Sequence, residues 1–195
     1  MKKLVIATAN HGKYKEFEYL IKTYGKNFFA DEIIFAPEIS NLIVGETGKT
    51  YAENAMLKAR AWAEKSGLPC LADDSGLEVE ALDGAPGLYS ARIIQGTENK
   101  ISWLLGELKG KSNRRARFTA SLALCVPDEY ILICDGHCSG VIADAPRGSN
   151  GFGYDPLFIP DGYEKTFAEL SQEIKNSISH RTNAFKKIAA YLTKK

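Results

Sequence analysis

The sequence has little of what a nucleic-acid-binding or membrane protein needs. Its formal net charge is only +1, and acidic and basic residues are mixed along the chain. A dedicated nucleic-acid or membrane-surface protein would usually carry a basic patch or tail. No apolar run approaches the roughly 20 residues that a helix needs to span a bilayer. We therefore expect neither nucleic acid nor a membrane as a partner.

The first residues also lack the pattern of a secretion signal. The basic start Met1-Lys2-Lys3 precedes an apolar stretch that is too short, and polar Thr8 and Asn10 interrupt it. We therefore expect a cytoplasmic protein. The length of 195 residues suits one domain over residues 1–195 that can bury a full core.

Cysteine is scarce, with four residues in the chain. Cys70, Cys125 and Cys134 lie in apolar, strand-like runs, where cysteine behaves as a small hydrophobic residue. The segment Cys134-Asp135-Gly136-His137-Cys138 contains metal-ligand types, but its spacing matches no common zinc pattern. We therefore interpret the cysteines as structural residues.

Helix and strand patterns alternate in the first half of the chain, and a hairpin pattern follows. Apolar residues at helical spacing predict helices over residues 13–24, 50–66, 97–108 and 182–192, the second and third capped by Thr50 and Thr97. Short or alternating apolar runs predict strands over residues 4–7, 32–36, 70–72, 117–126, 130–138 (extending to 142) and 157–159. This order favours an α/β fold with a central twisted mixed β-sheet flanked by helices.

A polar loop, Thr8-Ala9-Asn10-His11-Gly12-Lys13, directly follows the first predicted strand and opens a helix. Such a helix start offers unpaired N–H groups and a partial positive charge. Gly12 lets a ligand approach the backbone, and Lys13 adds a full positive charge. The spacing is not that of a Walker A loop. The loop suits a polyphosphate, although Gly and Lys also occur in such junctions for structural reasons.

Carboxylates form a second candidate site. Asp73-Asp74 follows the predicted strand 70–72, at the carboxyl end where α/β sheets place ligands. Mg²⁺ would relieve their repulsion, because it binds carboxylate and phosphate oxygens together. Glu46, on a glycine-flanked loop, is a further candidate ligand, and Lys58 could point at a phosphate. The structural alternatives are a solvated turn for Asp73-Asp74, an ordinary surface acid for Glu46 and a solvated lysine for Lys58.

Two later segments could hold a base. The loop over residues 148–156 places Phe152 and Tyr154 between glycines, and an aromatic ring offers a stacking surface. Lys175 and Ser179-His180-Arg181 gather hydrogen-bond donors ahead of the last predicted helix, and such donors can serve a carbonyl-bearing ring or a phosphate. A glycine-rich hairpin connection and a serine-capped helix start explain the same residues without a ligand.

Together, these segments resemble the inosine triphosphate pyrophosphatase (Ham1-like) family from about residue 3 to residue 187. The resemblance rests on these motifs: Thr8-x-Asn10-x-Gly12-Lys13, Glu46-Thr47-Gly48, Glu53-Asn54-Ala55-x-x-Lys58-Ala59, Asp73-Asp74-Ser75-Gly76-Leu77, Gly84-Ala85-Pro86-Gly87-x-Tyr89-Ser90-Ala91-Arg92, Phe152-Gly153-Tyr154-Asp155-Pro156 and Ser179-His180-Arg181. Residues 93–97 lack the aromatic-then-Gly pattern often found there, which leaves the shape of one loop open.

The resemblance implies a Mg²⁺-dependent hydrolase that converts ITP, dITP and XTP to the monophosphate and pyrophosphate. It also implies a homodimer, and two lobes with the active site in a cleft between them. The implied triphosphate-binding residues are Thr8, Ala9, Asn10, His11, Gly12, Lys13 and Lys58. The implied metal ligands are Glu46 and Asp74, with Asp74 as proton acceptor and Lys13 as the second catalytic residue. The implied remaining substrate contacts are Ser75, Phe152, Gly153, Tyr154, Asp155, Lys175, His180 and Arg181.

Two other functions stay open at this point. A Maf-like pyrophosphatase acting on pyrimidine or modified nucleotides shares the early motif, but we do not expect the Phe152–Asp155 and Ser179–Arg181 motifs there. A nucleotide-binding sensor without turnover would not need the carboxylates Glu46, Asp73 and Asp74.

Overall fold

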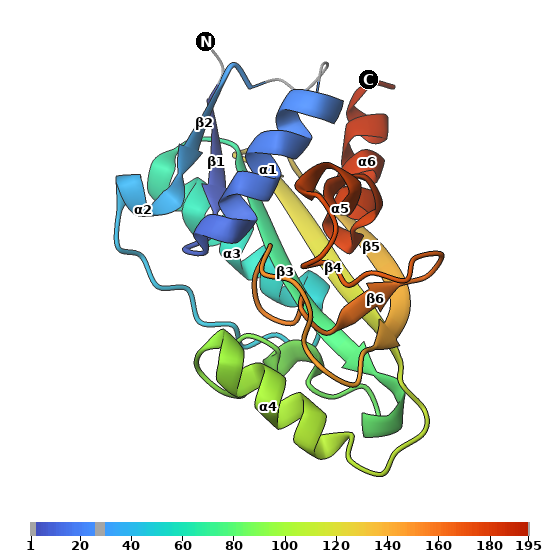
Figure 1. Ribbon diagram of the computed structural model, residues 1–195. Coiled ribbons are helices and arrows are strands. Elements are labelled where there is room, and N and C mark those ends of the chain that lie inside the picture. Colours follow the sequence, from blue (N-terminus) through green and yellow to red (C-terminus); the bar gives the residue numbers. More distant parts are fainter. Residues whose placement is uncertain (1–2, 26–29, 195) are drawn as a thin grey trace. The chain divides into compact units, whose positions relative to one another are not determined.

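The computed structural model describes residues 3–25 and 30–194. A six-stranded sheet has the strand order β2-β1-β3-β4-β5-β6 (Figure 1). The strands are β1 (Lys3–Ala7), β2 (Glu32–Phe35), β3 (Cys70–Val79), β4 (Arg115–Val126), β5 (Tyr130–Ile142) and β6 (Phe158–Pro160). The strand β1 pairs in parallel with β2 and β3, whereas β5 and β6 are antiparallel. The predicted mixed sheet is therefore confirmed.

The helices confirm the predicted ones and add two short ones. They are α1 (His11–Tyr24), α2 (Ala36–Ile39), α3 (Tyr51–Ser66), α4 (Thr97–Glu107), α5 (Gln172–Ile178) and α6 (His180–Leu192), with 3₁₀ turns at Glu80–Leu82 and Gly87–Tyr89. The helices α2 and α5 are too short to produce a clear apolar period. The predicted cap at Thr97 is wrong, because Gly96 occupies the N-cap position. In the ranges that the structure describes, no helix has the length and apolar character that a membrane crossing requires.

The chain divides into two compact units. Unit 1 comprises residues 1–74, 120–136 and 181–195, and unit 2 comprises residues 75–119 and 137–180. The predicted single domain and its two-lobed cleft stay predictions.

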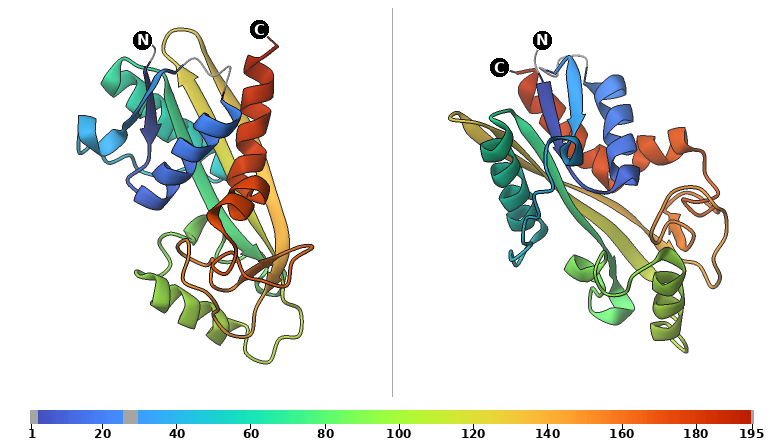
Figure 2. Two further views of the ribbon diagram at one scale, coloured as in Figure 1. Left: turned by 45° about the horizontal axis from the view of Figure 1, so that its top comes forward. Right: turned by 90° about the vertical axis from the view of Figure 1, so that its left-hand side faces the viewer.

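Unit 1 has an apolar core on each face of its strands, because successive strand residues point to opposite faces. The helix α3 packs on one face, through Ala55, Ala59 and Trp62 against Val5, Cys70 and Ala72. The helices α1 and α6 pack on the other, through Phe17, Leu20 and Phe185 against Leu4, Ile6 and Leu71. Figure 2 shows these helices on opposite sides of β1 and β3.

The strand β3 is longer than predicted. We expected it to end at Ala72, with Asp73 and Asp74 in the following loop, but the strand continues to Val79. The prediction is wrong because buried carboxylates interrupt the apolar pattern that marks a strand, although partners from distant segments make their burial tolerable. The two carboxylates consequently lie within β3 and face opposite sides of the sheet.

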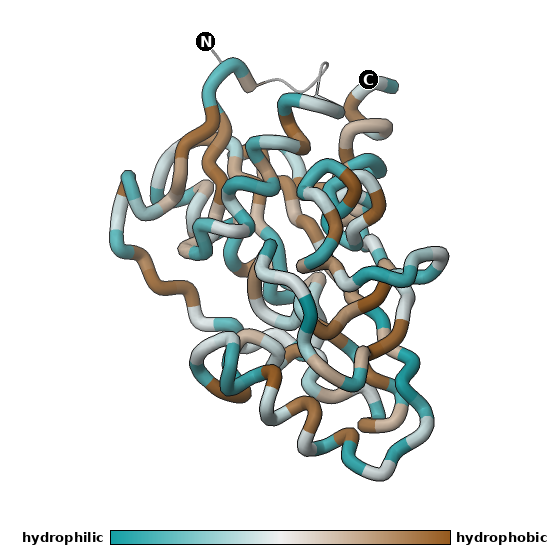
Figure 3. Tube along the Cα trace, viewed as in Figure 1, coloured by the Kyte–Doolittle hydropathy of each residue, from teal (hydrophilic) through white to brown (hydrophobic). Residues whose placement is uncertain are grey.

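Unit 2 has its own core, which contains Phe118, Phe158 and Phe167. The rings of Phe118 and Phe158 meet edge to face, with 4.7 Å between centroids. Figure 3 shows hydrophobic and hydrophilic residues in alternation along α4, whose Ile101 and Leu104 pack on this core.

Candidate active site

The loop that joins β1 to α1 is shaped by its own polar side chains. The carboxamide oxygen of Asn10 accepts a hydrogen bond from the backbone N–H of Lys13 at 3.1 Å, and Thr8 Oγ1 accepts from the N–H of Asn10 at 3.1 Å. Asn10 therefore caps α1, which begins at His11, two residues before the predicted start. Ala9, Asn10 and His11 are exposed. The loop thus offers an anion the positive end of a helix.

Asp73 faces α1 and α6. Its Oδ2 atom lies 2.6 Å from Lys13 Nζ and 3.1 Å from Arg181 Nη2. Arg181 also pairs with Glu16, and all these side chains are at least four-fifths buried. Burial alone would raise the pKa of Asp73, but the charges of Arg181 and Lys13 outweigh it and hold that pKa well below its usual value. Burial lowers the pKa of Lys13, and Asp73 only partly opposes this. We call Lys13, Glu16, Asp73 and Arg181 the buried charge cluster.

Asp74 faces α3 and has different partners. Lys58 Nζ lies 3.3 Å from Asp74 Oδ1 and 2.6 Å from Glu46 Oε1. The side-chain amide of Asn54 donates to Asp74 Oδ2 at 3.0 Å. Burial raises the pKa of Asp74, and the nearby Lys58 charge offsets this only in part. The structure therefore brings together three predicted site residues, Glu46, Lys58 and Asp74, in unit 1.

Asn54 joins the loop that carries Glu46 to Asp74. It is fully buried, and its side-chain oxygen accepts from the N–H of Gly48 at 2.8 Å. A Cβ atom on Gly48 would lie 2.6 Å from Glu53 Cβ and 2.8 Å from Asn54 Oδ1, so a side chain does not fit there. The N-terminus of α3 is fixed by Thr50, which accepts from the N–H of Glu53 at 3.1 Å as predicted. Asn54 therefore positions two carboxylate-bearing segments at once.

The residues present fit a divalent cation that shares its coordination with substrate. Two carboxylates, Glu46 and Asp74, converge on one positive charge, Lys58 Nζ. Over residues 3–25 and 30–194, no group of three or more His, Cys, Asp or Glu side chains is arranged to hold a metal. Mg²⁺ usually takes one or two carboxylates, and phosphates and water fill the other positions. Asp73 fits less well as a ligand, because two positive charges, Lys13 and Arg181, already contact its Oδ2 atom, whereas Glu46 and Asp74 share one.

In unit 2, the glycine-rich loop folds around Asp155. Its Oδ2 atom accepts from the N–H of Phe152 at 2.8 Å and pairs with Lys175 Nζ at 2.6 Å. The Lys175 ammonium lies 4.7 Å from the ring centroid of Phe152. Gly151 has φ +77°, and a Cβ atom there would lie 2.0 Å from Asp155 Oδ2. The loop therefore holds the half-buried Phe152 ring in one place.

The other predicted substrate contacts differ in their surroundings. The His180 ring stacks on Phe118, with 4.8 Å between centroids and 13° between planes. The hydroxyl of buried Tyr154 has no hydrogen-bond partner among the described residues, and burial raises its pKa to about 12. Ser75 is half-buried. The Arg181 side chain belongs to the buried charge cluster of unit 1, so its predicted contact with the base stays a prediction.

Two residues of these networks, Glu16 and Asn54, have no role in the prediction from the sequence. Asp73 is predicted there only as part of the Asp73-Asp74 metal site, and not as a partner of Lys13 and Arg181. Asn54 had a usable signal, because it lies four residues before Lys58 and therefore on the same face of α3. Glu16 had none, since its partner Arg181 is 165 residues away in the sequence.

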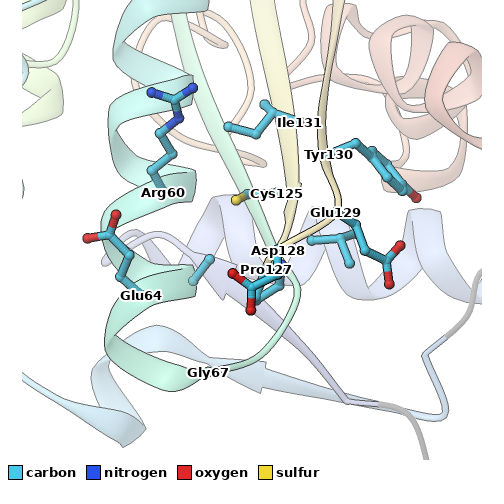
Figure 4. A pocket seen from close by; sticks show the side chains of 11 residues that line it. Arg60, Glu64, Gly67, Cys125, Pro127, Asp128, Glu129, Tyr130 and Ile131 are labelled. Carbon is cyan, nitrogen blue, oxygen red and sulfur yellow. The ribbon is translucent and has the colours of Figure 1, made fainter.

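A separate pocket in unit 1 has a volume of about 850 Å³, and Figure 4 shows the side chains that line it. It is lined by Arg60 and Glu64 of α3 and by the turn between β4 and β5, including Pro127 and Asp128. None of the predicted site residues lines it.

The fold and these contacts define an α/β protein with an exposed, capped helix start after its first strand and a pair of carboxylates, Glu46 and Asp74, that share the Lys58 ammonium. The Ham1 family model matches residues 4–191, and the chain belongs to this family. The dITP/XTP pyrophosphatase of Bacillus licheniformis is 43% identical over 198 residues, covering 98% of this chain and 98% of that protein. The dITP/XTP pyrophosphatase of Bacillus subtilis is 44% identical with the same coverage. The Ham1 protein of Staphylococcus aureus has a similar structure, with a TM-score of 0.86, 42% identity, and 99% of each chain covered.

Proposed function

We propose that the protein is a Mg²⁺-dependent nucleoside triphosphate pyrophosphatase. It hydrolyses the non-standard purine nucleotides ITP, dITP and XTP to the monophosphate and pyrophosphate, and so cleanses the nucleotide pool. The main supporting observation is the convergence of Glu46 and Asp74 on one cation, Lys58 Nζ. The names of the Bacillus relatives, both dITP/XTP pyrophosphatases, support the substrate class.

Unit 1 carries the residues proposed for the reacting phosphates. The loop over residues 8–13 binds the triphosphate through its N–H groups, and Lys13 stabilises the charge of the departing pyrophosphate. Bound Mg²⁺, held by Glu46 and Asp74, would supply positive charge to the phosphate oxygens. Asp74 Oδ1 accepts a proton from the attacking water, while Asn54 holds Oδ2 in place.

Unit 2 carries the residues proposed for the base, with Phe152 as a stacking surface and Lys175 and His180 as donors. Hypoxanthine and xanthine present a 6-oxo acceptor, whereas adenine presents a 6-amino donor. A donor-lined site would leave ATP with donor against donor, at a cost of about 1–3 kcal/mol for each unpaired group. Several such mismatches can give roughly 10⁴-fold discrimination.

We also propose that the protein acts in the cytoplasm as a homodimer. Light scattering during size-exclusion chromatography tests the dimer, since one chain has a mass of 21.4 kDa. A dimer elutes with twice that mass, and a peak at the single-chain mass contradicts the proposal.

The decisive experiment identifies the products of ITP hydrolysis. The enzyme is incubated with ITP and Mg²⁺ in ¹⁸O-water, and the products are separated by ion chromatography and analysed by mass spectrometry. We expect IMP and intact pyrophosphate in equal amounts, and no turnover when EDTA removes the metal. Release of phosphate with accumulation of IDP would instead identify a γ-phosphatase.

A competition panel of ITP, XTP, ATP and pyrimidine triphosphates tests the base assignment. Preference for a pyrimidine would favour a Maf-like activity, and binding without turnover would favour a sensor. The variant Asp74→Asn provides the inactive control in both experiments.

A further inference from the structure

Lys58 lies where two carboxylates need a positive charge. Its Nζ atom is 2.6 Å from Glu46 Oε1 and 3.3 Å from Asp74 Oδ1, and its side chain is only 14% exposed. Two carboxylates brought together in a largely buried place repel each other unless a cation compensates them. The Lys58 ammonium therefore supplies the charge that the same two residues would receive from a divalent metal.

We propose that Lys58 is the resident counter-ion of the Glu46–Asp74 pair and competes with the divalent cation for it. This inference rests on the proposed function, in which Glu46 and Asp74 are metal ligands. A divalent cation and an ammonium held at the same two carboxylates would repel each other strongly. Lys58 must therefore leave the carboxylates before the metal can take them.

The side chain of Lys58 can leave without a change in the fold. Four flexible methylene groups connect its ammonium to α3, so the charge can move while the helix stays in place. The carboxylates remain held, because Asn54 donates to Asp74 Oδ2 and accepts from the N–H of Gly48 in the Glu46 loop. The exchange therefore replaces one cation by another between two carboxylates that Asn54 already holds in position.

The exchange couples metal binding to nucleotide binding. Once displaced, the Lys58 ammonium has lost both carboxylates, and a substrate phosphate is the anion that would replace them. Metal binding without nucleotide therefore carries the cost of an uncompensated lysine, and nucleotide removes that cost. By linkage, each ligand tightens the binding of the other.

The test measures the affinity of the nucleotide-free protein for Mn²⁺, by electron paramagnetic resonance of the free ion. The variant Lys58→Met removes the charge but keeps most of the chain length. We expect it to bind Mn²⁺ at least ~10-fold more tightly than wild type, because the competing cation is gone. Its turnover of ITP should nevertheless fall, since the phosphate contact is lost. Tighter metal binding with slower turnover is the signature of a competitor.

Two variants serve as controls. Lys58→Arg keeps the charge and should not bind Mn²⁺ more tightly than wild type. Lys65→Met removes the same charge from an exposed position on the same helix and should leave Mn²⁺ affinity unchanged. Thermal melts establish that each variant is folded, and Lys58→Gln, which keeps a donor for Glu46, replaces Lys58→Met if that variant does not fold.

Unchanged or weaker Mn²⁺ binding in the charge-removing Lys58 variants would overturn the proposal. The variant Glu46→Gln separates this outcome from failure of the proposed metal site. If Glu46→Gln weakens Mn²⁺ binding but loss of the Lys58 charge does not strengthen it, the metal site stands and the competition is wrong. If Glu46→Gln also has no effect, the metal site itself is wrong.

Discussion

The two faces of β3 place the adjacent carboxylates Asp73 and Asp74 in opposite electrostatic surroundings. On the α1 and α6 face, Asp73 is held by Lys13 and Arg181 in the buried charge cluster, and its pKa lies well below the usual value. On the α3 face, Asp74 shares Lys58 with Glu46, and burial raises its pKa. One carboxylate is thus fixed as a charge, and the other has a partner that can be exchanged. We expect Asp73 to contribute mainly to stability and Asp74 mainly to activity.

The largest expected effect is on the stability of Asp73→Asn. The substitution leaves Lys13 and Arg181 without their shared carboxylate in a buried place, which should lower the free energy of unfolding by about 3–5 kcal/mol. Urea denaturation followed by circular dichroism measures it. The control Asp128→Asn, at an exposed turn position, should change stability by less than about 0.5 kcal/mol. A loss as small as that of the control would contradict a structural role for Asp73.

Asp74→Asn should show the reverse pattern. Asparagine keeps the shape but cannot take a proton, so kcat for ITP should fall by roughly 100-fold or more. Stability should change by less than about 1 kcal/mol, because Lys58 retains Glu46. Steady-state kinetics at saturating Mg²⁺ and the same urea titration provide the two measurements. Near-normal turnover in this variant would remove Asp74 from the mechanism.

Asn54→Ala should produce an intermediate effect on the α3 face alone. It leaves the N–H of Gly48 and a carboxylate oxygen of Asp74 without their partner, which should cost about 1–3 kcal/mol of stability. A positioning role further requires weaker Mn²⁺ binding, which loss of stability by itself would not cause in the folded fraction. Asn99→Ala, at an exposed position on α4, is the matched control and should alter neither property.

The smallest expected effect is a difference in acid sensitivity, measured in the presence of EDTA. The depressed pKa of Asp73 means that its stabilisation is present above about pH 3.9, the unfolded value, and is lost as the pH falls further. The raised pKa of Asp74 means that the fold disfavours its ionised form, so stability is gained as the pH falls through that pKa. Asp73→Asn should therefore flatten the acid limb of a stability–pH curve, and Asp74→Asn should steepen it. Parallel curves for both variants would refute the difference between the faces.

The sequence predicts those parts of the site that depend on residues close to one another along the chain. The strand, polar loop and helix over residues 4–24 follow from local pattern, and Thr50 caps α3 as expected. The position of Asp73 within a strand could not be predicted in this way. Its burial depends on Arg181, 108 residues away in the sequence, and no local pattern contains that pairing. The Lys58 contact with Asp74 is likewise formed only by the fold.

The contact between Gly48 and Asn54 has a consequence for how this segment can vary. The N–H of Gly48 must reach the amide of a residue six positions later, and no space remains for a side chain on Gly48. The number of residues between Gly48 and Asn54 therefore sets where Glu46 lies. Exposed Lys49 can be exchanged for another residue as long as its backbone N–H remains, because its contact within the described part of the chain is made by that N–H, which donates to Glu53 Oε2. Insertion or deletion of a single residue between Gly48 and Asn54 would instead shift Glu46 away from Lys58. At Lys49 the chain therefore tolerates a change of identity far better than a change of length.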